Sequence, residues 1–522
     1  MRLTPPGIIA AATAVLLSAL AADALSADPG PALPPEPDVA QLQSALMTHR
    51  TTVSAVVEHY LQRINALDTH GPALHSIIQV NPEAKALAAK LDAAPTAGGI
   101  LFGVPIVLKD NIETADRLLT TAGSLALADS KPRRDAFIVR KLRASGALIL
   151  AKTNLSEWAN FRSSHSTSGW SGRGGLTHNP YDTTRNACGS SSGSGAAVAA
   201  DLSVLAVGTE TDGSIVCPSS FNGLVGIKPT VGLVSRSGII PISDKQDTAG
   251  PMTRSVADAA ALLTVIAGYD PDDAATASLK DAPPPDYRKF LDTGALKGKR
   301  IGVVRKLAGF DDGVDAVFNQ AVKVLRAQGA IVVDPVDLPN ADKLAADELT
   351  ALQYEFKDGL NRNLAARTGP GPHSLAELIQ WNKAHATTEM PWFSQDILDA
   401  SQSKGPLTDA AYIQAREKVR RLAAKEGIDV ALAHDHLDAL IAPTAGPAFV
   451  NDLVNGDHIV GGNVTTPPAI AGYPHITVPM GQVHGLPVGL SFVGAAFSEP
   501  KLIGIAYSYE QASHARRPPR LR

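Results

Sequence analysis

The sequence predicts one large α/β domain built around a mostly parallel or mixed sheet. Short apolar segments typical of buried strands occur at 104–108 and in the stretches "GALILAKT", "LSVLAVGTET" and "GVVRK", and helical patterns lie between them. Strands that alternate with helices indicate α/β layers. The chain shows no internal repeat and no clean linker, so one large domain is expected rather than two.

Composition narrows the class of protein. The chain has 522 residues, of which 44% are hydrophobic and 19% charged, which is ordinary for a globular protein with a sizeable core. The formal net charge of -4 leaves no basic stripe, so a nucleic-acid partner is not expected. A neutral or weakly charged small substrate fits this composition better.

The cysteine count excludes two kinds of site. Only Cys188 and Cys217 occur, too few for a disulfide scaffold or a four-thiolate zinc site. A buried free cysteine is a common structural filler, whereas a disulfide between the two requires an oxidising compartment. We therefore expect free thiols, and the sequence leaves the disulfide open.

The N-terminus predicts a secretory signal peptide. Arg2 precedes an apolar run at 7–22, and the small-residue stretch that follows offers cleavage between Ala21 and Ala27. A membrane anchor is the alternative, but Asp23 interrupts the run, which is short for a span. We expect residues 1–27 to be removed, leaving a domain of 28–522 that is secreted or periplasmic, without stable membrane association.

Helical periodicity predicts two features along the chain. An amphipathic helix is expected within 38–68, with Thr51 or Thr52 as its N-cap. A more charged, mostly helical section at about 274–430 separates two parts of the expected core, about 96–270 and 431–515. We expect this middle section to line the substrate pocket and set side-chain preference.

The stretch "NACGSSSGSGAAVAA" at 186–200 runs into a helix, and such a loop can hold an anion. No Gly-Lys-Ser or Gly-Lys-Thr follows, which disfavours a phosphate loop. The pattern G-x-S-x-G at 189–193 would instead make Ser191 a nucleophile and require a later histidine. That histidine could be His436, His475 or His484.

Ser214 is a second candidate for the nucleophile. In "VGTETDGSIVCP" a strand runs into Gly213 and Ser214. Glycine before a serine allows a tight turn, so that consecutive N–H groups can converge beside the hydroxyl. This is the geometry that an oxyanion hole requires.

Several motifs together carry a family resemblance. The stretches "GVPIVLKDNI", "KTNLSEWA", "CGSSSGSGAAVAA", "GTETDGSIVCPSSFNGLVGIKPT", "DTAGPMTRSVADAA", "AGYPHITVPMG" and "GLPVGLSFVG" occur between 101 and 494. The chain thereby resembles the amidase signature family. The resemblance implies a single domain with a mixed central sheet covered by helices on both sides. Within the family, "CGSSSGS" and "TETDGSIVCP" look most like peptide amidases.

The resemblance implies a role for individual residues. It makes Ser214 the nucleophile, Ser190 the cis serine that relays the proton, and Lys109 the catalytic lysine. The oxyanion would be held by the N–H groups of Thr211, Asp212, Gly213 and Ser214. No metal or organic cofactor is implied.

Elementary chemistry agrees with this assignment. A serine hydroxyl is a weak nucleophile until a base removes its proton, and Lys109 is the only base that these motifs supply. A lysine can act as a base only when it is neutral, and burial after an apolar strand lowers its pKa. A hydroxyl both donates and accepts, so Ser190 can connect the lysine to Ser214.

Departures from the wider family concern three positions where many members have glycine: Cys188, Ser192 and Asp212. They favour the peptide-amidase branch. Asp212 is either a turn residue or a carboxylate that orients Ser190 or a substrate N–H. Asn154 is a second candidate for substrate binding, with a structural role in its loop as the alternative.

The expected function is release of ammonia from C-terminal peptide amides through an acyl-enzyme. The alternatives are an aryl or aliphatic amidase, an amidotransferase component of the same fold, and a non-catalytic binding protein. A cytoplasmic amidotransferase conflicts with a signal peptide, and joint retention of Lys109, Ser190 and Ser214 argues against a non-catalytic protein. The sequence leaves the oligomeric state open, and a monomer fits it.

Overall fold

Residues 34–94 and 99–521 are described by a computed structural model, and they belong to one compact unit. The predicted signal peptide, residues 1–27, lies outside the described residues. Within the described ranges, no helix combines the length and apolar character needed to cross a membrane.

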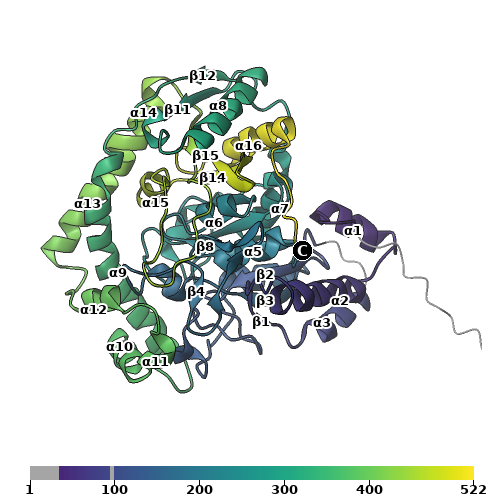
Figure 1. The fold of residues 1–522 in the computed structure, drawn as a ribbon, viewed down its shortest axis with the longest axis vertical. Coiled ribbons are helices and arrows are strands. Elements are labelled where there is room, and N and C mark those ends of the chain that lie inside the picture. Colours follow the sequence, from purple (N-terminus) through teal and green to yellow (C-terminus); the bar gives the residue numbers. More distant parts are fainter. Residues whose placement is uncertain (1–33, 95–98, 522) are drawn as a thin grey trace, which may run out of the picture. The chain divides into compact units, whose positions relative to one another are not determined.

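Eleven strands form one mixed sheet (Figure 1). In spatial order they are β1 (Ile77–Val80), β3 (Leu148–Thr153), β2 (Pro105–Lys109), β8 (Leu205–Glu210), β10 (Thr248–Thr253), β9 (Val225–Lys228), β14 (His475–Val483), β15 (Leu486–Val493), β13 (Ala439–Pro443), β11 (Arg300–Val303) and β12 (Ile331–Val333). β2 runs parallel to β3 and β8, β11 runs parallel to β12 and β13, and the other pairs are antiparallel. The predicted α/β architecture with a mixed sheet is confirmed.

Two separate groups of helices cover the sheet. The first is α5 (Ser192–Ala199) with α6 (Val216–Phe221), which contact each other and strands β8, β9, β14 and β15. The second is α4 (Phe137–Ala144), α7 (Val256–Ile266), α8 (Asp312–Ala327) and α16 (Glu499–Ser513). The site described below lies at the ends of β2 and β8, on the side of α5 and α6.

The remaining helices precede the sheet or belong to its insertions. They are α1 (Val39–Met47), α2 (Val53–Arg63), α3 (Ala84–Asp92), α9 (Ala345–Ala366), α10 (Leu375–Ala384), α11 (Ala386–Glu389), α12 (Asp396–Gln402), α13 (Ala410–Ala423), α14 (Asp429–His434) and α15 (Thr466–Ala471). Two-stranded sheets join β4 (Trp170–Ser171) to β5 (Gly175–Leu176) and β6 (His178–Asn179) to β7 (Asp182–Asn186).

The helix expected within 38–68 is present but divided into α1 and α2. Thr52 caps α2 as predicted, because its hydroxyl accepts a hydrogen bond from the Ala55 N–H at 3.1 Å. The apolar positions Val53, Val56 and Tyr60 are buried. The polar run before Thr52 separates α1 from α2.

The middle section 274–430 is mostly helical, as expected, but it also contains β11 and β12 at one edge of the sheet. Its helices α9 and α13 lie side by side (Figure 1, green). Every fourth residue of α9 from Leu352 to Leu364 is buried in a second apolar core. Phe161 and Ile242, from loops of the first part of the chain, belong to this core, which joins α9 to those loops.

A buried guanidinium holds this second core to the loops beneath it. Arg162 is fully buried and donates to Glu157 Oε1 at 2.8 Å and to the Phe393 carbonyl at 3.3 Å. The ring of Phe393 lies 4.2 Å from the guanidinium carbon, within the range of a cation–π contact. Burial raises the pKa values of Glu157 and its neighbour Glu389, and the Arg162 charge opposes that rise.

Replacing Arg162 with Gln should lower the free energy of unfolding by about 3 kcal/mol, because two buried carboxyl groups lose their cation. Chemical denaturation at pH 7 measures the change. Lys306→Gln is the matched control, because it removes the cation of an exposed ion pair with Asp337 and should leave stability unaltered. Equal stability of Arg162→Gln and the wild type would contradict the structural role of Arg162.

Candidate active site

A cavity of about 340 Å³ lies where β8 ends. Its wall includes the turn residues 211–214, the loop residues 188 and 189, and 459, 461–463, 465 and 466 from the C-terminal part. Phe161, Ile242 and Leu352 add an apolar side that is the edge of the second core. Among the described residues of the middle section, Leu352 alone lines the cavity. Most of the wall therefore comes from other parts of the chain.

A second, larger cleft, of about 1190 Å³, is lined by many arginine and aspartate side chains. Most of these form ion pairs with one another, such as Arg236 with Asp273 and Arg362 with Asp244. The large cleft contains none of the catalytic residues predicted from sequence. The smaller cavity is therefore the candidate active site.

Ser214 lies in the turn between β8 and α6 and faces the cavity. Gly213 before it has φ of 76°, a left-handed conformation that favours glycine, and an added Cβ would lie 3.3 Å from Thr465 Oγ1. Glu210 fixes the far side of the turn, because its Oε2 accepts hydrogen bonds from the N–H groups of Ile215 and Val216 at 2.7 and 3.0 Å.

The N–H groups of Asp212, Gly213 and Ser214 donate to no acceptor within the described ranges. The Thr211 hydroxyl is held at 2.6 Å by Asp247 Oδ1. The turn thus presents consecutive N–H groups on a fixed backbone beside the Ser214 hydroxyl. Backbone N–H donors arranged in this way can stabilise a negative charge that develops on a substrate oxygen.

Ser190 lies outside the cavity wall, although Gly189 directly before it lines the cavity. Ser190 is 1% exposed and Ser214 is 9% exposed. The Gly189–Ser190 peptide bond is cis, as the resemblance implied. Only glycine fits at 189, because an added Cβ would lie 2.2 Å from Ser156 Oγ. The Ser191 N–H donates to the Ser214 carbonyl at 3.2 Å and so holds the two segments together.

Lys109 ends β2 and is fully buried. Its Nζ lies 2.7 Å from Ser190 Oγ, 2.9 Å from Thr209 Oγ1 and 3.1 Å from the Thr209 carbonyl. Burial lowers the pKa of Lys109 to about 7, although the carboxylates of Asp247 and Glu210 oppose the change. Near neutral pH the amine is therefore free to accept a proton.

Two other lysines are buried but contact different groups. Lys152 on β3 donates to the Ile112 carbonyl at 2.6 Å and to Thr120 Oγ1 at 2.7 Å. Lys228 on β9 donates to the carbonyl of the next residue at 3.1 Å. Burial lowers the pKa of each to about 8. Burial alone therefore does not single out Lys109, and its contact with Ser190 does.

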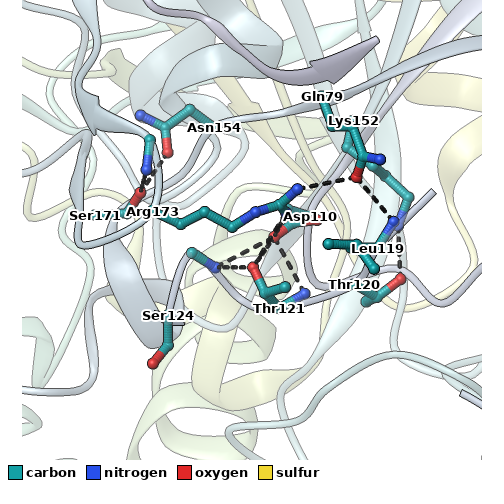
Figure 2. A network of polar contacts seen from close by, with 12 residues as sticks. Gln79, Asp110, Leu119, Thr120, Thr121, Ser124, Lys152, Asn154, Ser171 and Arg173 are labelled. Carbon is teal, nitrogen blue, oxygen red and sulfur yellow. Dashed lines mark hydrogen bonds and ion pairs between the residues drawn. The ribbon is translucent and has the colours of Figure 1, made fainter. Parts of the chain in front are cut away.

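A polar network fixes the chain directly after Lys109 (Figure 2). Asp110 Oδ2 accepts the N–H of Thr121 at 3.1 Å and lies 3.5 Å from Arg173 Nη1. Arg173 reaches on to Gln79 Oε1 at 2.9 Å. Figure 2 shows Thr121 and Arg173, from separate loops, meeting at Asp110, and Gln79 of β1 at the far end of Arg173. The network holds the end of β2, and with it the lysine, in one position.

Sequence reasoning missed Thr209 and Asn111. The Thr209 hydroxyl lies between Lys109 Nζ at 2.9 Å and Asn111 Nδ2 at 3.0 Å, and both residues are buried. Both occur inside motifs that were recognised, "GTETDGS" and "LKDNI". Polar residues at the ends of two apolar strands were the available signal.

Asn154 is not brought to the cavity. Its Nδ2 donates to the carbonyls of Gly169 and Gly175 and to Thr177 Oγ1, and its Oδ1 accepts from Ser171 Oγ at 2.7 Å (Figure 2). The side chain is fully buried. Its hydrogen-bonding groups are used within the protein, which gives it a structural role in place of the substrate contact expected from sequence.

The alternative hypothesis that Ser191 is the nucleophile is wrong. Its Oγ exchanges hydrogen bonds with the backbone of Thr209, at 3.1 and 3.2 Å. Of the candidate histidines, His475 is buried against Ser491 Oγ at 2.6 Å, and His436 and His484 are exposed. Ser191 instead binds its loop to β8.

Cys188 and Cys217 form a disulfide, which corrects the expectation of free thiols. Their Cα atoms lie 6.0 Å apart, and the side chains pack with Phe221 and Phe449 in a small apolar cluster. Both cysteines line the cavity. The bond connects the loop that carries Ser190 to the helix that follows Ser214. Spacing alone could not reveal it, because 29 positions separate the two residues.

Comparisons with known proteins identify the family of the chain. The protein-family model described as Amidase matches residues 55–503. The chain is 41% identical over 498 residues to the Arabidopsis thaliana protein named "Probable amidase At4g34880", covering 93% of this chain and 91% of that protein. It is 36% identical over 504 residues to a glutamyl-tRNA(Gln) amidotransferase protein of Microcystis aeruginosa, covering 92% and 99%. The crystal structure of native peptide amidase from Stenotrophomonas maltophilia matches at 52% identity with a TM-score of 0.88, covering 93% and 99%.

Removing the disulfide by the double substitution Cys188→Ser and Cys217→Ser should lower the free energy of unfolding by about 3–4 kcal/mol, the loop-closure effect for this separation. Denaturation curves of the oxidised wild type and the variant measure the difference. Dithiothreitol should destabilise the wild type and leave the variant unaffected. Two reactive thiols in the denatured, unreduced wild type would contradict the bond.

Proposed function

Because the chain belongs to the amidase family, and is therefore a hydrolase of amide C–N bonds, we propose that it releases ammonia from the C-terminal amide of peptides. The catalytic residues of this proposal are Lys109, Ser190 and Ser214. The contact between the buried amine of Lys109 and the Ser190 hydroxyl carries the chemical part of the proposal. The similarity to peptide amidase over almost the whole chain supports the substrate class.

In the first step the Ser214 hydroxyl attacks the carbonyl carbon of the carboxamide. Its proton passes to Ser190 Oγ, while the Ser190 proton passes to the neutral amine of Lys109. The carbonyl oxygen becomes an oxyanion that accepts hydrogen bonds from the N–H groups of the turn 211–214. The residues of this turn already lie in the cavity wall.

The surroundings of Lys109 suit a neutral amine. A neutral amine has two N–H donors and one lone pair. The carbonyl and hydroxyl oxygens of Thr209 can take the two donors, at 3.1 and 2.9 Å. The lone pair then faces the Ser190 hydroxyl at 2.7 Å, ready to take its proton.

The relay then runs in reverse. Lys109 returns its proton to Ser190, which protonates the leaving nitrogen so that ammonia departs and an ester to Ser214 remains. Water attacks this ester with the same two residues as base, and the free acid leaves. The Ser191 N–H to Ser214 carbonyl bond and the Cys188–Cys217 disulfide keep the relay serine beside the nucleophile throughout.

We also propose that the protein works outside the cytoplasm, as a secreted or periplasmic enzyme. A disulfide persists in an oxidising compartment, and the apolar N-terminal run is typical of a secretory signal. An amidotransferase component, the activity named for the Microcystis relative, would work in the cytoplasm with partner proteins. The disulfide therefore favours hydrolysis over that alternative.

Ammonia release tests the function with matched substrates: a peptide amide, the same peptide as free acid, and simple aryl and aliphatic amides. The peptide amide should be hydrolysed with the highest kcat/KM. Ser214→Ala should abolish this activity, by about 10⁴-fold or more, because no other hydroxyl replaces the nucleophile. Ser192→Ala is the matched control, since its buried Oγ has no partner in the described part of the chain and its loss should preserve activity. Surviving activity in a folded Ser214→Ala protein would overturn the assignment.

The pH dependence tests the state of Lys109. The amine must be neutral to accept a proton, so kcat/KM should reach a plateau above about pH 7 and fall about tenfold per unit below it. Initial rates from pH 5 to 9 measure this profile. A Lys152→Met variant should keep the same acid limb, because Lys152 contacts Ile112 and Thr120 instead. A profile that stays flat down to pH 5 would exclude a neutral Lys109 as the base.

A further inference from the structure

A second hollow, of about 470 Å³, lies next to the active-site cavity. The two spaces share one short segment of the chain, 458–461. Its residues alternate, so that Ile459 and Gly461 line the cavity while His458 and Val460 line the hollow. Alternation of this kind is typical of an extended chain, whose side chains point to its two sides in turn. The segment 458–461 is therefore the rim between the two spaces, and a chain that leaves the cavity over this rim enters the hollow.

A second connection between the two spaces is apolar. Phe449 lines the hollow and packs with Cys188 and Cys217, whose disulfide lines the cavity. The Phe449 carbonyl accepts a hydrogen bond from the N–H of Asn186 at 2.8 Å, and Asn186 ends β7. The chain runs from there into the loop that carries Ser190. The side of the hollow that holds Phe449 is thereby attached to the catalytic loop.

The rim is held against the cavity wall by Asp457, the residue directly before it. Asp457 Oδ1 accepts the N–H of Ser168 at 2.8 Å, and its Oδ2 accepts the Ser168 hydroxyl at 2.5 Å. Ser168 itself lines the cavity. The Val460 carbonyl accepts the N–H of Gly446 at 2.8 Å, which joins the rim to the segment that leads to Phe449. A rim that is fixed without a substrate reduces the entropic cost of binding one.

The hollow exposes apolar side chains to water. Val450 and Val460 line it and are 54% and 50% exposed, and Ile459 on the rim is 46% exposed. A single exposed apolar side chain is ordinary on a protein surface. Several of them together beside a cavity are typical of a binding surface, because a ligand that covers them removes apolar area from water.

The charged side chains of the hollow are bonded to the protein's own groups. Asp452 Oδ1 accepts two backbone N–H groups of the turn that follows it, each at 2.9 Å, and its Oδ2 lies 3.3 Å from His458 Nε2. Asp311 Oδ1 accepts an N–H of the first turn of α8 at 2.8 Å. Arg185 Nη1 donates to the Ala448 carbonyl at 3.2 Å. An apolar group therefore fits the hollow better than a charged one.

We propose that the hollow is a second substrate site, which binds an apolar side chain upstream of the C-terminal residue of a peptide amide. This inference rests on the proposed function and identifies where the rest of the peptide binds. With the carboxamide at Ser214, the C-terminal residue occupies the cavity and the preceding chain passes over the rim at Ile459. Each extended residue advances the chain by about 3.3–3.6 Å, so the first or second upstream residue meets Val450 and Val460.

Ammonia release from three substrates tests the site: N-acetyl-Gly-Gly-Phe-amide and the two peptides in which Leu replaces one of its glycines. With the wild type, a Leu peptide should have a kcat/KM about 5- to 10-fold above that of the Gly-Gly peptide, because a leucine side chain is partly removed from water. The gain should lie in KM, since a contact remote from the reacting atoms is the same in the ground and transition states. Equal kcat/KM for all three peptides would overturn the second site.

The double substitution Val450→Ser and Val460→Ser should reduce the preference for leucine to less than about twofold, because it removes the exposed apolar surface of the hollow. Val430→Ser is the matched control, since Val430 on α14 is 47% exposed and lines neither space, and it should keep the full preference. The ratio between two substrates is measured in one preparation, so a partly unfolded fraction does not alter it. A preference that survives the double substitution would overturn the assignment of the hollow. Absence of ammonia release from all three peptides by the wild type would instead overturn the proposed function.

Discussion

Burial of one amine at the end of β2 is the constraint on which the site depends. Lys109 is enclosed between β3 and β8, where water cannot stabilise its charge, and its partners are hydroxyl and carbonyl oxygens. The neutral form is therefore favoured near pH 7. A base of this kind can act only through a hydroxyl that reaches into the same enclosed space. The Ser190 hydroxyl occupies that place, and Ser214 lines the cavity, where the proposed reaction takes place.

The proposed relay requires two segments to meet, those of Ser190 and Ser214, which are 24 positions apart in sequence. Three interactions hold them together. The Ser191 N–H donates a hydrogen bond to the Ser214 carbonyl, Ser191 Oγ exchanges hydrogen bonds with the backbone of Thr209, and Cys188 forms a disulfide with Cys217. These contacts use backbone groups, the Ser191 hydroxyl and the two cysteines, and none of them uses the hydroxyl group of Ser190 or Ser214. The two hydroxyl groups therefore stay available for the proposed proton transfer while their backbone is held.

The middle section contributes to the site through one helix. α9 places Leu352 in the cavity wall. The same helix is buried along its length in the second core with Phe161 and Ile242. The packing that stabilises the helical insertion thus also shapes the apolar side of the cavity. The middle section, which was expected to line the substrate pocket, supplies Leu352 to the cavity wall, and the C-terminal segment 459–466 supplies more of that wall.

The sequence by itself determined the α/β class, the N-cap of α2 and the positions of Lys109, Ser190 and Ser214 within recognisable motifs. These features depend on short-range patterns: strand and helix periodicity, turn chemistry and ordered motifs. The tertiary structure alone decided that Thr209 and Asn111 support Lys109, that Cys188 and Cys217 are bonded, and that Asn154 is structural. The physical reason is register. β2 pairs in parallel with β8, Leu108 opposite Val207, and this alignment brings the residues that follow each strand together. A shift of one residue would turn Lys109 to the other face of the sheet, and nothing local in either strand encodes that alignment.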